Sequence, residues 1–320
     1  MMAHVAAPMH LRKSIWAIAL TAMLLLHCSK ESSTPSLFPI KNPNELIPQQ
    51  LPTSGPYYHT LRTATSDDGI TWKEDREEDL VLHASVPSAA QLWDGTIAVY
   101  FVDFSSGSPE RLGCVTSRDW GKTFTWGDAS ISGMATEKAV DFAPLRMPTG
   151  EVRMYYYASD QQVNSTGPHT IDLALGDKVG MSFARSATVF TYPGLVDPDI
   201  FYNGKEWIMH VFSLTDGATI RATSPDGLTS FTYKDILQPT GYGVTQPLYY
   251  YDNKYRMFGF PQGPNMQTRF VSFISDDGYT WTLQPGDRLT APTGYEITDP
   301  YVIQLFTGKL FMVYKRSKKP

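Results

Sequence analysis

A short turn motif recurs five times along this 320-residue chain, and it constrains the fold more than any other feature. Three copies place a glycine directly after Ser-x-Asp and end on an aromatic residue: SDDGITW, SPDGLTSF and SDDGYTW. A fourth copy, SRDWGKTF, has one additional residue between the Asp and the Gly, and a fifth, GDKVGMSF, is degraded. The glycines Gly69, Gly121, Gly180, Gly227 and Gly278 are separated by 52, 59, 47 and 51 residues. A regular spacing of this size indicates a repeat architecture.

A second motif lies between the copies of the first and keeps the same period. Each copy has an apolar strand, a turn containing Gly, Asp or Asn, and a second strand rich in Val, Met, Tyr and Phe, which is the pattern of a buried hairpin. The five copies are VPSAAQLWDGTIAVYF, DFAPLRMPTGEVRMYYY, DPDIFYNGKEWIMHVF, QPLYYYDNKYRMFGF and DPYVIQLFTGKLFMVY. Their first residues are Val86, Asp141, Asp197, Gln246 and Asp299, separated by 55, 56, 49 and 53 residues.

Two hairpins in each of five units predict an all-β fold, a five-bladed β-propeller of four-stranded blades over residues 56–320. Segments with helical periodicity are absent outside the N-terminal region. The domain begins with an outer hairpin, residues 57–82, and ends with an inner one, residues 299–316. We therefore expect the last hairpin to pair with the first and close the ring.

The first thirty residues have the pattern of a targeting segment. Arg12 and Lys13 precede the apolar run IWAIALTAMLLL, which is too short to span a bilayer comfortably. LLHC followed by SKESSTPS resembles a bacterial lipoprotein signal in which Cys28 is lipidated, whereas His27 stands where a small residue is usual and leaves ordinary secretion as the alternative. We predict a signal over residues 1–28, a Ser/Pro-rich tether over 29–55, and an exported protein, lipid-anchored in the outer membrane or periplasm, or secreted.

Composition argues against several other classes of function. The net charge is −5, and the basic residues are scattered apart from the terminal KRSKK, which we interpret as a solvated end, so nucleic-acid binding is disfavoured. Cys114, in RLGCVTS, is expected to be a buried strand residue. No CxxC, HExxH, phosphate-binding glycine loop or GxSxG occurs. We expect a monomer and predict no cofactor, while an axial calcium ion is left open.

The eight-residue copy SRDWGKTF resembles the Asp-box of sialidases and other secreted propellers. The copies of the form S-x-D-G, together with DPDIFYNGKEWIMHVF and TDPYVIQLFTGKLFMVY, resemble five-bladed glycoside hydrolases of the arabinanase/xylosidase and invertase families. This resemblance implies a carbohydrate ligand and hydrolysis of glycosidic bonds. The turn itself is expected to be structural, since its glycine allows a positive φ and its Ser, Asp and Thr side chains bond to backbone amides.

The inner strands of a propeller begin near the axis, where convergent polar groups form the default ligand site. Three of the five aligned first residues are carboxylates. Glycoside hydrolysis requires two carboxyl groups, one protonated and one ionised, and crowding of like charges separates their pKa values. The predicted catalytic set is therefore Asp141, Asp197 and Asp299, with Glu137 or Glu296, on the loops before two of these strands, as the acid.

A second group of residues is predicted to bind substrate: Asp199, Arg146, His210, Gln246, Arg269, Tyr242 and Tyr295. Asp199 lies two residues beyond Asp197 and so on the same strand face. Tyr155, Tyr157, Trp207 and Tyr301 are further candidates for contact with a sugar ring. Each has a structural alternative: an Asp before Pro is often a turn residue, and a histidine inside WIMHVF is more often part of a core.

The sequence also departs from the families that it resembles. The arabinanase/xylosidase pattern has a catalytic carboxylate in each of three blades, with the acid a Glu, and here the blade that starts at Val86 offers only Ser85 and Ser88. A sialidase usually has Arg-Ile-Pro where this chain has Ser85, Val86 and Pro87, and the invertase Asn-Asp-Pro-Asn-Gly motif is absent. Two alternatives therefore remain beside hydrolysis: a non-catalytic glycan-binding or scaffold propeller, and a sialidase-like Asp-box protein.

Overall fold

The structure is a computed structural model, and it describes residues 37–46, 55–106, 111–134, 139–158, 167–244, 247–249, 253–263 and 266–319. These residues form 24 strands and a single-turn 3-10 helix, η2 (Gly55–Tyr58). Within this part of the chain no helix has the length and hydropathy needed to cross a membrane. The predicted signal, with Cys28, lies outside the described residues.

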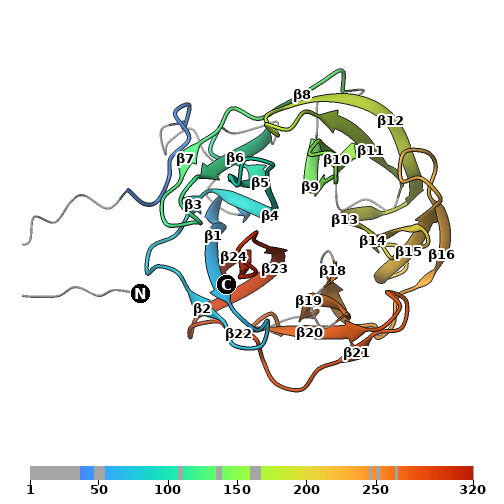
Figure 1. Cartoon of the computed structure of the whole chain (residues 1–320). Coiled ribbons are helices and arrows are strands. Elements are labelled where there is room, and N and C mark those ends of the chain that lie inside the picture. The colour runs from blue at the N-terminus through green and yellow to red at the C-terminus, as the bar shows by residue number, and fades with distance from the viewer. Residues whose placement is uncertain are drawn as a thin grey trace, which may run out of the picture. The chain divides into compact units, whose positions relative to one another are not determined.

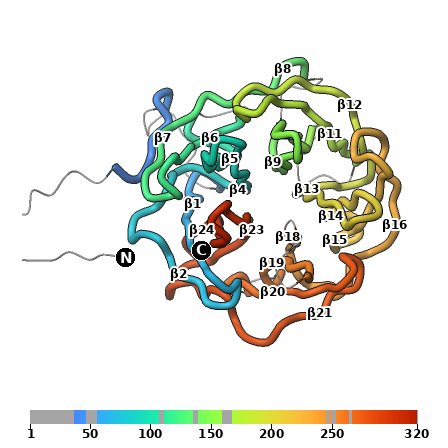
Figure 2. Tube along the Cα trace, viewed as in Figure 1, coloured from blue at the N-terminus to red at the C-terminus, as the bar shows by residue number. Residues whose placement is uncertain are grey.

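Five small antiparallel sheets surround a central axis like the blades of a propeller (Figure 1), and the backbone passes from blade to blade in chain order around the ring (Figure 2). The predicted fold class is confirmed. Blade 1 contains β4 (Ala84–Gln91), β5 (Ile97–Asp103), β6 (Arg111–Ser117) and β7 (Thr125–Trp126). Blade 2 contains β8 (Ser130–Ser132), β9 (Ala139–Arg146), β10 (Val152–Ala158), β11 (Pro168–Gly176) and β12 (Ser182–Pro193).

The other three blades complete the ring. Blade 3 contains β13 (Leu195–Tyr202), β14 (Trp207–Ser213), β15 (Ala218–Ser224) and β16 (Thr232–Ile236). Blade 4 contains β17 (Tyr242–Val244), β18 (Leu248–Tyr249), β19 (Tyr255–Pro261), β20 (Arg269–Ser275), β21 (Thr282–Leu283) and β22 (Leu289–Thr290). Blade 5 contains β23 (Tyr295–Gln304), β24 (Leu310–Lys318), β1 (Thr60–Ser66), β2 (Lys73–Glu74) and β3 (Val81–Leu82).

Blade 5 is built from both ends of the chain. Its strands follow the order β2-β1-β24-β23, and β1 pairs with β24 from Thr60 opposite Arg316 to Ser66 opposite Leu310. Figure 1 shows the blue β1 beside the red β24. The expected closure of the ring by the terminal hairpins is thus confirmed.

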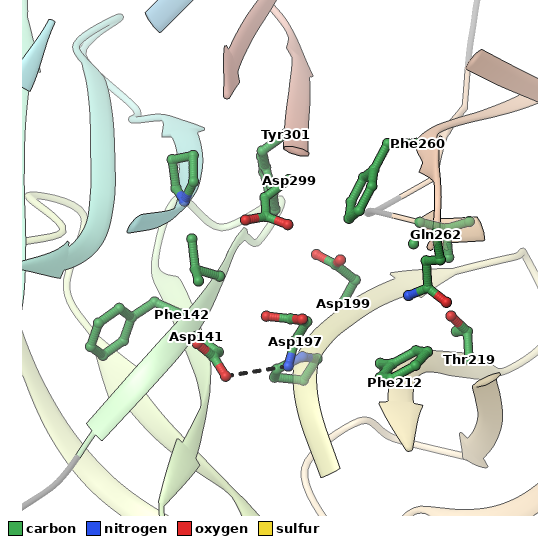
Figure 3. A pocket seen from close by; sticks show the side chains of 15 residues that line it. Asp141, Phe142, Asp197, Asp199, Phe212, Thr219, Phe260, Gln262, Asp299 and Tyr301 are labelled. Carbon is green, nitrogen blue, oxygen red and sulfur yellow. Dashed lines mark hydrogen bonds between the residues drawn. The ribbon is translucent and has the colours of Figure 1, made fainter. Parts of the chain in front are cut away.

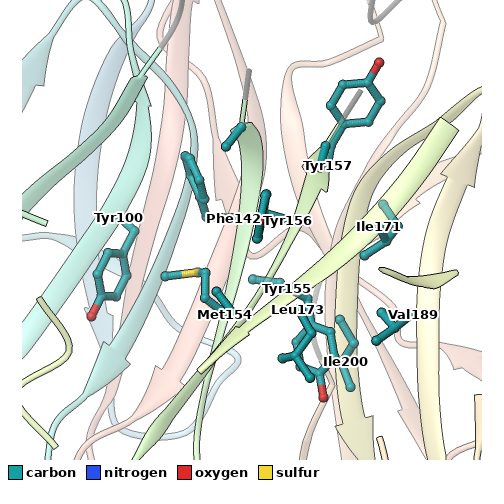
Figure 4. Close-up of a cluster of buried hydrophobic side chains, with 14 of the residues drawn as sticks. Tyr100, Phe142, Met154, Tyr155, Tyr156, Tyr157, Ile171, Leu173, Val189 and Ile200 are labelled. Atoms are coloured by element: carbon teal, nitrogen blue, oxygen red, sulfur yellow. The ribbon is translucent and has the colours of Figure 1, made fainter. Parts of the chain in front are cut away.

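The hydrophobic pattern of each strand follows its depth in the blade. All seven residues of β5 and all seven of β19 are buried, because a second strand is covered by its neighbours in the sheet and by blades on both faces. This explains continuous apolar runs such as IAVYFV, which alternation alone does not describe. The outer strand β16 is largely exposed and reads TYKDI. Figure 4 shows the cluster that blades 1, 2 and 3 share around Tyr100 and Tyr155.

The repeated turn is held by its own side chains, as predicted. In the copy between β1 and β2, Ser66 Oγ accepts a hydrogen bond from the amide of Gly69 at 2.9 Å, and Asp68 Oδ1 accepts from Ile70 and Thr71 at 2.8 and 2.7 Å. The longer copy contains the additional residue Trp120, which is exposed and has a φ of 63°. These bonds satisfy amides that would otherwise lack partners, which is a structural role.

Each of these turns also packs against the preceding blade. Tyr100 of β5 donates a hydrogen bond to the carbonyl of Gly180 at 2.7 Å, and Tyr155 of β10 donates to that of Gly227 at 2.6 Å. The glycine is required by space as well as by φ, because a Cβ at Gly180 would lie 2.6 Å from the Tyr100 hydroxyl. The same relation joins Gly69 to blade 4, Gly121 to blade 5 and Gly278 to blade 3. The turn therefore connects neighbouring blades.

Part of the predicted tether belongs to this packed structure. The amide of Ile40 donates a hydrogen bond to the carbonyl of Leu80, and Asn42 Nδ2 donates to Asp103 Oδ2 at 2.7 Å. Residues 37–46 therefore lie against blades 5 and 1 instead of extending into solvent. Cys114 is buried, as predicted, and this burial raises the pKa of its thiol.

Candidate active site

Four of the inner strands, β4, β9, β13 and β23, have the same irregularity. At their aligned positions Val86, Asp141, Asp197 and Asp299 have φ values of 45°, 54°, 54° and 52°. Strand pairing shifts register at each of these points. A positive φ is uncommon outside glycine, and a bulge redirects the side chain of the residue that forms it. The fifth aligned residue, Gln246, lies outside the described residues.

These bulges turn their side chains toward a shared pocket. Figure 3 shows the carboxyl groups of Asp141, Asp197, Asp199 and Asp299 pointing into one space. The remaining lining residues are Val86, Pro87, Phe142, Pro198, Phe212, Thr219, Gly243, Val244, Phe260, Gln262 and Tyr301. The pocket thus combines four carboxyl groups with aromatic rings from several blades.

The carboxyl group of Asp197 has a strongly perturbed environment. Desolvation by burial, followed by the nearby charges of Asp141 and Asp299, raises its pKa well above the ordinary value, and Lys315 opposes this only in part. The amide of Asp197 also donates a hydrogen bond of 3.4 Å to Asp141 Oδ2. Asp197 therefore favours its protonated form in a group of carboxylates.

Lys315 is the residue that our interpretation of the C-terminal tail missed. The expectation that KRSKK forms a solvated end is wrong for its first residues, because β24 continues to Lys318. Lys315 Nζ lies 2.8 Å from Asp299 Oδ2, and the two side chains are only 18% and 16% exposed. Alternation along β24 gives no signal for this, because the five residues before Lys315 are all buried.

Several predicted substrate-binding residues do not line the pocket. Arg146 lies over the ring of Phe306, with its Cζ 5.0 Å from the centroid. His210 is only 1% exposed, packs beside Phe201, and has a pKa lowered to about 3 by burial. Arg269 pairs with Asp287 at 3.3 Å. These three residues serve packing or surface pairing in the structure.

The two predicted tyrosines and the predicted acid also lie apart from the pocket lining. Tyr242 packs edge-on against Phe273, and Tyr295 lies under the guanidinium of Arg316 at 4.8 Å. Glu296 is half-buried on β23, opposite Ser317 of β24. The alternative acid, Glu137, lies outside the described residues. Of the further aromatic candidates, Tyr301 alone lines the pocket, and its hydroxyl donates to the carbonyl of Pro144 at 3.2 Å.

Other lining residues were not predicted from the sequence. Phe212 and Thr219 come from the β14–β15 region of blade 3, and Phe260 and Gln262 come from β19 and the residues that follow it in blade 4. Phe212 and Phe260 resemble any other residue of an apolar strand, and Gln262 lies in a loop. Only the packing of blades around the axis brings these residues to the carboxylates.

The composition of the lining bears on what the pocket can bind. Among the described residues that line it, none is an arginine, so an arginine clamp for a sugar carboxylate is missing from this lining. No group of three or more His, Cys, Asp or Glu side chains in the described ranges is arranged to hold a metal ion. The lining is therefore acidic and aromatic.

Comparison with known proteins identifies the fold. No protein-family model and no curated protein match the sequence. A family 117 glycoside hydrolase of Zobellia galactanivorans has a similar structure, with a TM-score of 0.53, 12% identity, and coverage of 82% of this chain and 91% of that one. A GH43_1 enzyme from Xanthomonas citri gives a TM-score of 0.51, 14% identity, and coverage of 72% and 86%. A protein of unknown function from Dyadobacter fermentans gives 0.54, 17%, and coverage of 81% and 84%. The chain thus shares its fold with solved glycoside hydrolases.

Proposed function

We propose that the protein is a glycoside hydrolase that cleaves its substrate in the pocket lined by Asp141, Asp197 and Asp299. One observation carries this proposal: three aligned bulges direct carboxyl groups into one pocket, and one of these groups has a strongly raised pKa. A protonated carboxyl beside an ionised one is what cleavage of a glycosidic bond requires. The fold shared with solved glycoside hydrolases supports the same activity.

The three carboxyl groups take different roles in this proposal. Asp197 donates its proton to the leaving oxygen as the bond from that oxygen to the anomeric carbon breaks. Asp299, ion-paired with Lys315, either takes a proton from the attacking water or attacks the carbon itself. Asp141 accepts a hydrogen bond from the Asp197 amide, and its charge helps to keep the Asp197 proton in place. The acid role that the sequence suggested for Glu137 or Glu296 passes to Asp197.

The substrate that suits this pocket is a neutral sugar. The ionised carboxylates of this pocket repel a carboxylated sugar, and no arginine of the described lining compensates for that repulsion. Phe212 and Phe260 offer apolar ring faces, and Gln262 and Thr219 offer hydrogen bonds to hydroxyl groups. This chemistry argues against a sialidase, whose substrate carries a carboxylate.

A non-catalytic glycan-binding propeller is the second candidate. The observation that favours it is Val86, which occupies the same strained bulge as the three aspartates and brings no carboxylate to the pocket. Binding of a neutral glycan without its cleavage separates this candidate from the first.

The test is a hydrolysis screen with the purified full chain. Neutral aryl glycosides and neutral oligosaccharides are incubated with the protein, and release of the aryl group or of reducing ends is measured. We expect hydrolysis of at least one substrate and a loss of about 100-fold or more in Asp141→Asn, as for other groups that act on the transition state. Binding of a glycan without hydrolysis supports the second candidate, and hydrolysis that survives in Asp141→Asn shows that the assigned pocket is wrong.

We propose further that the protein is exported and anchored through a lipid on Cys28. The apolar run before LLHC and the polar stretch after it support this. Expressed in a bacterium, the full chain is expected to sediment with membranes, and Cys28→Ser is expected to move it to the soluble exported fraction. Equal membrane association of both proteins contradicts lipidation, and retention of both inside the cell contradicts export.

A further inference from the structure

We propose that Lys315 is a positioning residue of the pocket, whose ammonium group fixes the charge and orientation of Asp299 and thereby leaves the shared proton on Asp197. This inference rests on the proposed function for its catalytic meaning, while the arrangement of charges can be tested without any substrate. Lys315 does not line the pocket, so it acts through Asp299 and not on the substrate.

The position of Lys315 on β24 accounts for its contact with Asp299. Lys315 lies opposite Leu61 of β1 and opposite Thr298 of β23, the residue just before the bulge. The bulge turns Asp299 so that its Oδ2 lies 2.8 Å from Lys315 Nζ. Since this distance is that of a charge-assisted hydrogen bond, the ammonium group restricts the carboxylate that it contacts.

Titratable groups from β9, from β13 and from the residue before β1 lie around this pair. Asp141 comes from β9, Asp197 and Asp199 come from β13, and Asp299 itself comes from β23. His59, just before β1, has a pKa lowered to about 4, first by burial and then by the charge of Lys315, so it is neutral near pH 7. Its Nδ1 lies 3.1 Å from Ser85 Oγ. Within this described group, Lys315 therefore supplies the positive charge.

The ammonium group remains charged in spite of its surroundings. Burial acts to lower the pKa of Lys315, but the charge and the hydrogen bond of Asp299, together with the charge of Asp141, outweigh burial and raise it. A lysine that keeps its charge beside one member of a carboxylate group breaks the symmetry of that group. Without it, Asp299 and Asp197 would share one proton as a coupled pair, and the acid and base would no longer be distinct.

The first test follows carboxyl titration by ¹³C NMR in the full chain, with Lys315→Met compared with the wild type and with Lys315→Arg. Signals are assigned from Asp197→Asn and Asp299→Asn spectra. We expect Asp299 of Lys315→Met to release its proton at a higher pH than in the wild type, because its counter-charge is gone, and Lys315→Arg to stay close to the wild type. An unchanged titration in folded Lys315→Met overturns the proposal.

A second measurement covers the case in which Lys315→Met does not fold. The ¹⁵Nζ signal of Lys315 is titrated in the wild type and in Asp299→Asn. We expect the lysine to lose its proton at a lower pH in Asp299→Asn, because its closest counter-charge is gone. Identical lysine titrations in the two proteins show that the ion pair does not form and contradict the proposal.

Kinetics then separate this inference from the proposed function. With a substrate from the hydrolysis screen, Lys315→Met is expected to lower kcat about 10-fold or more with little change in KM and to shift the pH optimum, and Lys315→Arg is expected to restore the profile in part. A profile that keeps its shape in Lys315→Met contradicts the positioning role. If the wild type hydrolyses nothing, the proposed function fails, and the NMR titrations still decide whether Lys315 fixes the charge of Asp299.

Discussion

Asp197 combines a strained backbone with an electrostatic environment that disfavours its charge. Its φ of 54° costs conformational energy, and the charges of Asp141 and Asp299 disfavour its ionisation. Strain and perturbed titration concentrate at functional sites. Asp197 has both the strained φ and the raised pKa, as expected at a position where activity is favoured at the expense of stability.

This environment predicts a pH-dependent stability that Asp197→Asn removes. Because the pKa of Asp197 is raised in the folded state, the native protein holds a proton that the unfolded chain releases above about pH 4. The resulting stabilisation is present below that pH and is lost as the pH rises through the folded pKa. We therefore expect Asp197→Asn to gain stability relative to the wild type above pH 4, by up to about 1.4 kcal/mol per pH unit until the folded pKa is reached.

Urea unfolding of both proteins between pH 4 and pH 8 measures this difference. Other titrating groups are common to the two proteins, so their contributions cancel to first order. Unfolding free energies that stay parallel across the whole range show that Asp197 ionises normally in the folded protein.

At the scale of single elements, the repeated turn and the axial bulge have separate tasks. The turn joins each blade to the preceding one, and the bulge directs a side chain toward the axis. Both recur with the same period, so the elements that build the ring also align the positions that form the pocket. The sequence alignment of Val86, Asp141, Asp197 and Asp299 predicted which residues come together. It did not predict the positive φ values, because nothing local distinguishes a bulged strand start from a regular one.

The connecting role of the turn predicts a difference between two glycine substitutions. Gly180 has a φ of 66°, and a Cβ there would meet the Tyr100 hydroxyl at 2.6 Å and Leu92 Cδ2 at 2.8 Å. Gly204 has a φ of 87° with nothing within 4 Å of its Cβ position. Gly204→Ala is expected to cost about 1–2 kcal/mol from backbone strain alone. Gly180→Ala is expected to cost about 1–3 kcal/mol more, because it also separates two blades.

Thermal and urea unfolding of the two alanine variants provide the comparison. Gly204→Ala is the matched control, since it has the same kind of backbone strain without the contact. Equal destabilisation of the two proteins means that the turn does not join blades 1 and 2.

At the scale of the whole molecule, ring closure makes the two ends of the propeller depend on each other. β24 pairs with β23 on one side and with β1 on the other, so its loss opens blade 5 and exposes the cores that it shares with blades 4 and 1. A chain that stops after Lys309 is expected to lose cooperative unfolding and to collect in the insoluble fraction. As the control, a chain that stops after Lys318 keeps every strand pair of β24 and is expected to melt like the full chain. Cooperative folding of the chain that stops after Lys309 contradicts closure of the ring by β24.

The sequence predicted the ring more completely than the pocket for a physical reason. The number of blades, the number of strands and the closure of the ring follow from the spacing of the two motifs, and each repeat is an independent observation of that spacing. The roles of Phe212 and Phe260 depend on the packing of the blades, because both belong to ordinary strands and reach the carboxylates only around the axis. The role of Lys315 depends on the bulge that turns Asp299 toward it within the same hairpin. The residue type of Arg146 and Arg269 suggested contact with a sugar. The fold instead places Arg146 over the ring of Phe306 and pairs Arg269 with Asp287.

The central claim is that the axial carboxyl groups cleave a glycosidic bond, and the most direct measurement is kcat/KM of the wild type and of Asp197→Asn on the best neutral glycoside from the screen. Hydrolysis by the wild type and a fall of about 1,000-fold or more in a fully folded Asp197→Asn protein are the predicted results, because the variant has no proton to donate to the leaving oxygen. Equal activity of the two proteins contradicts the account.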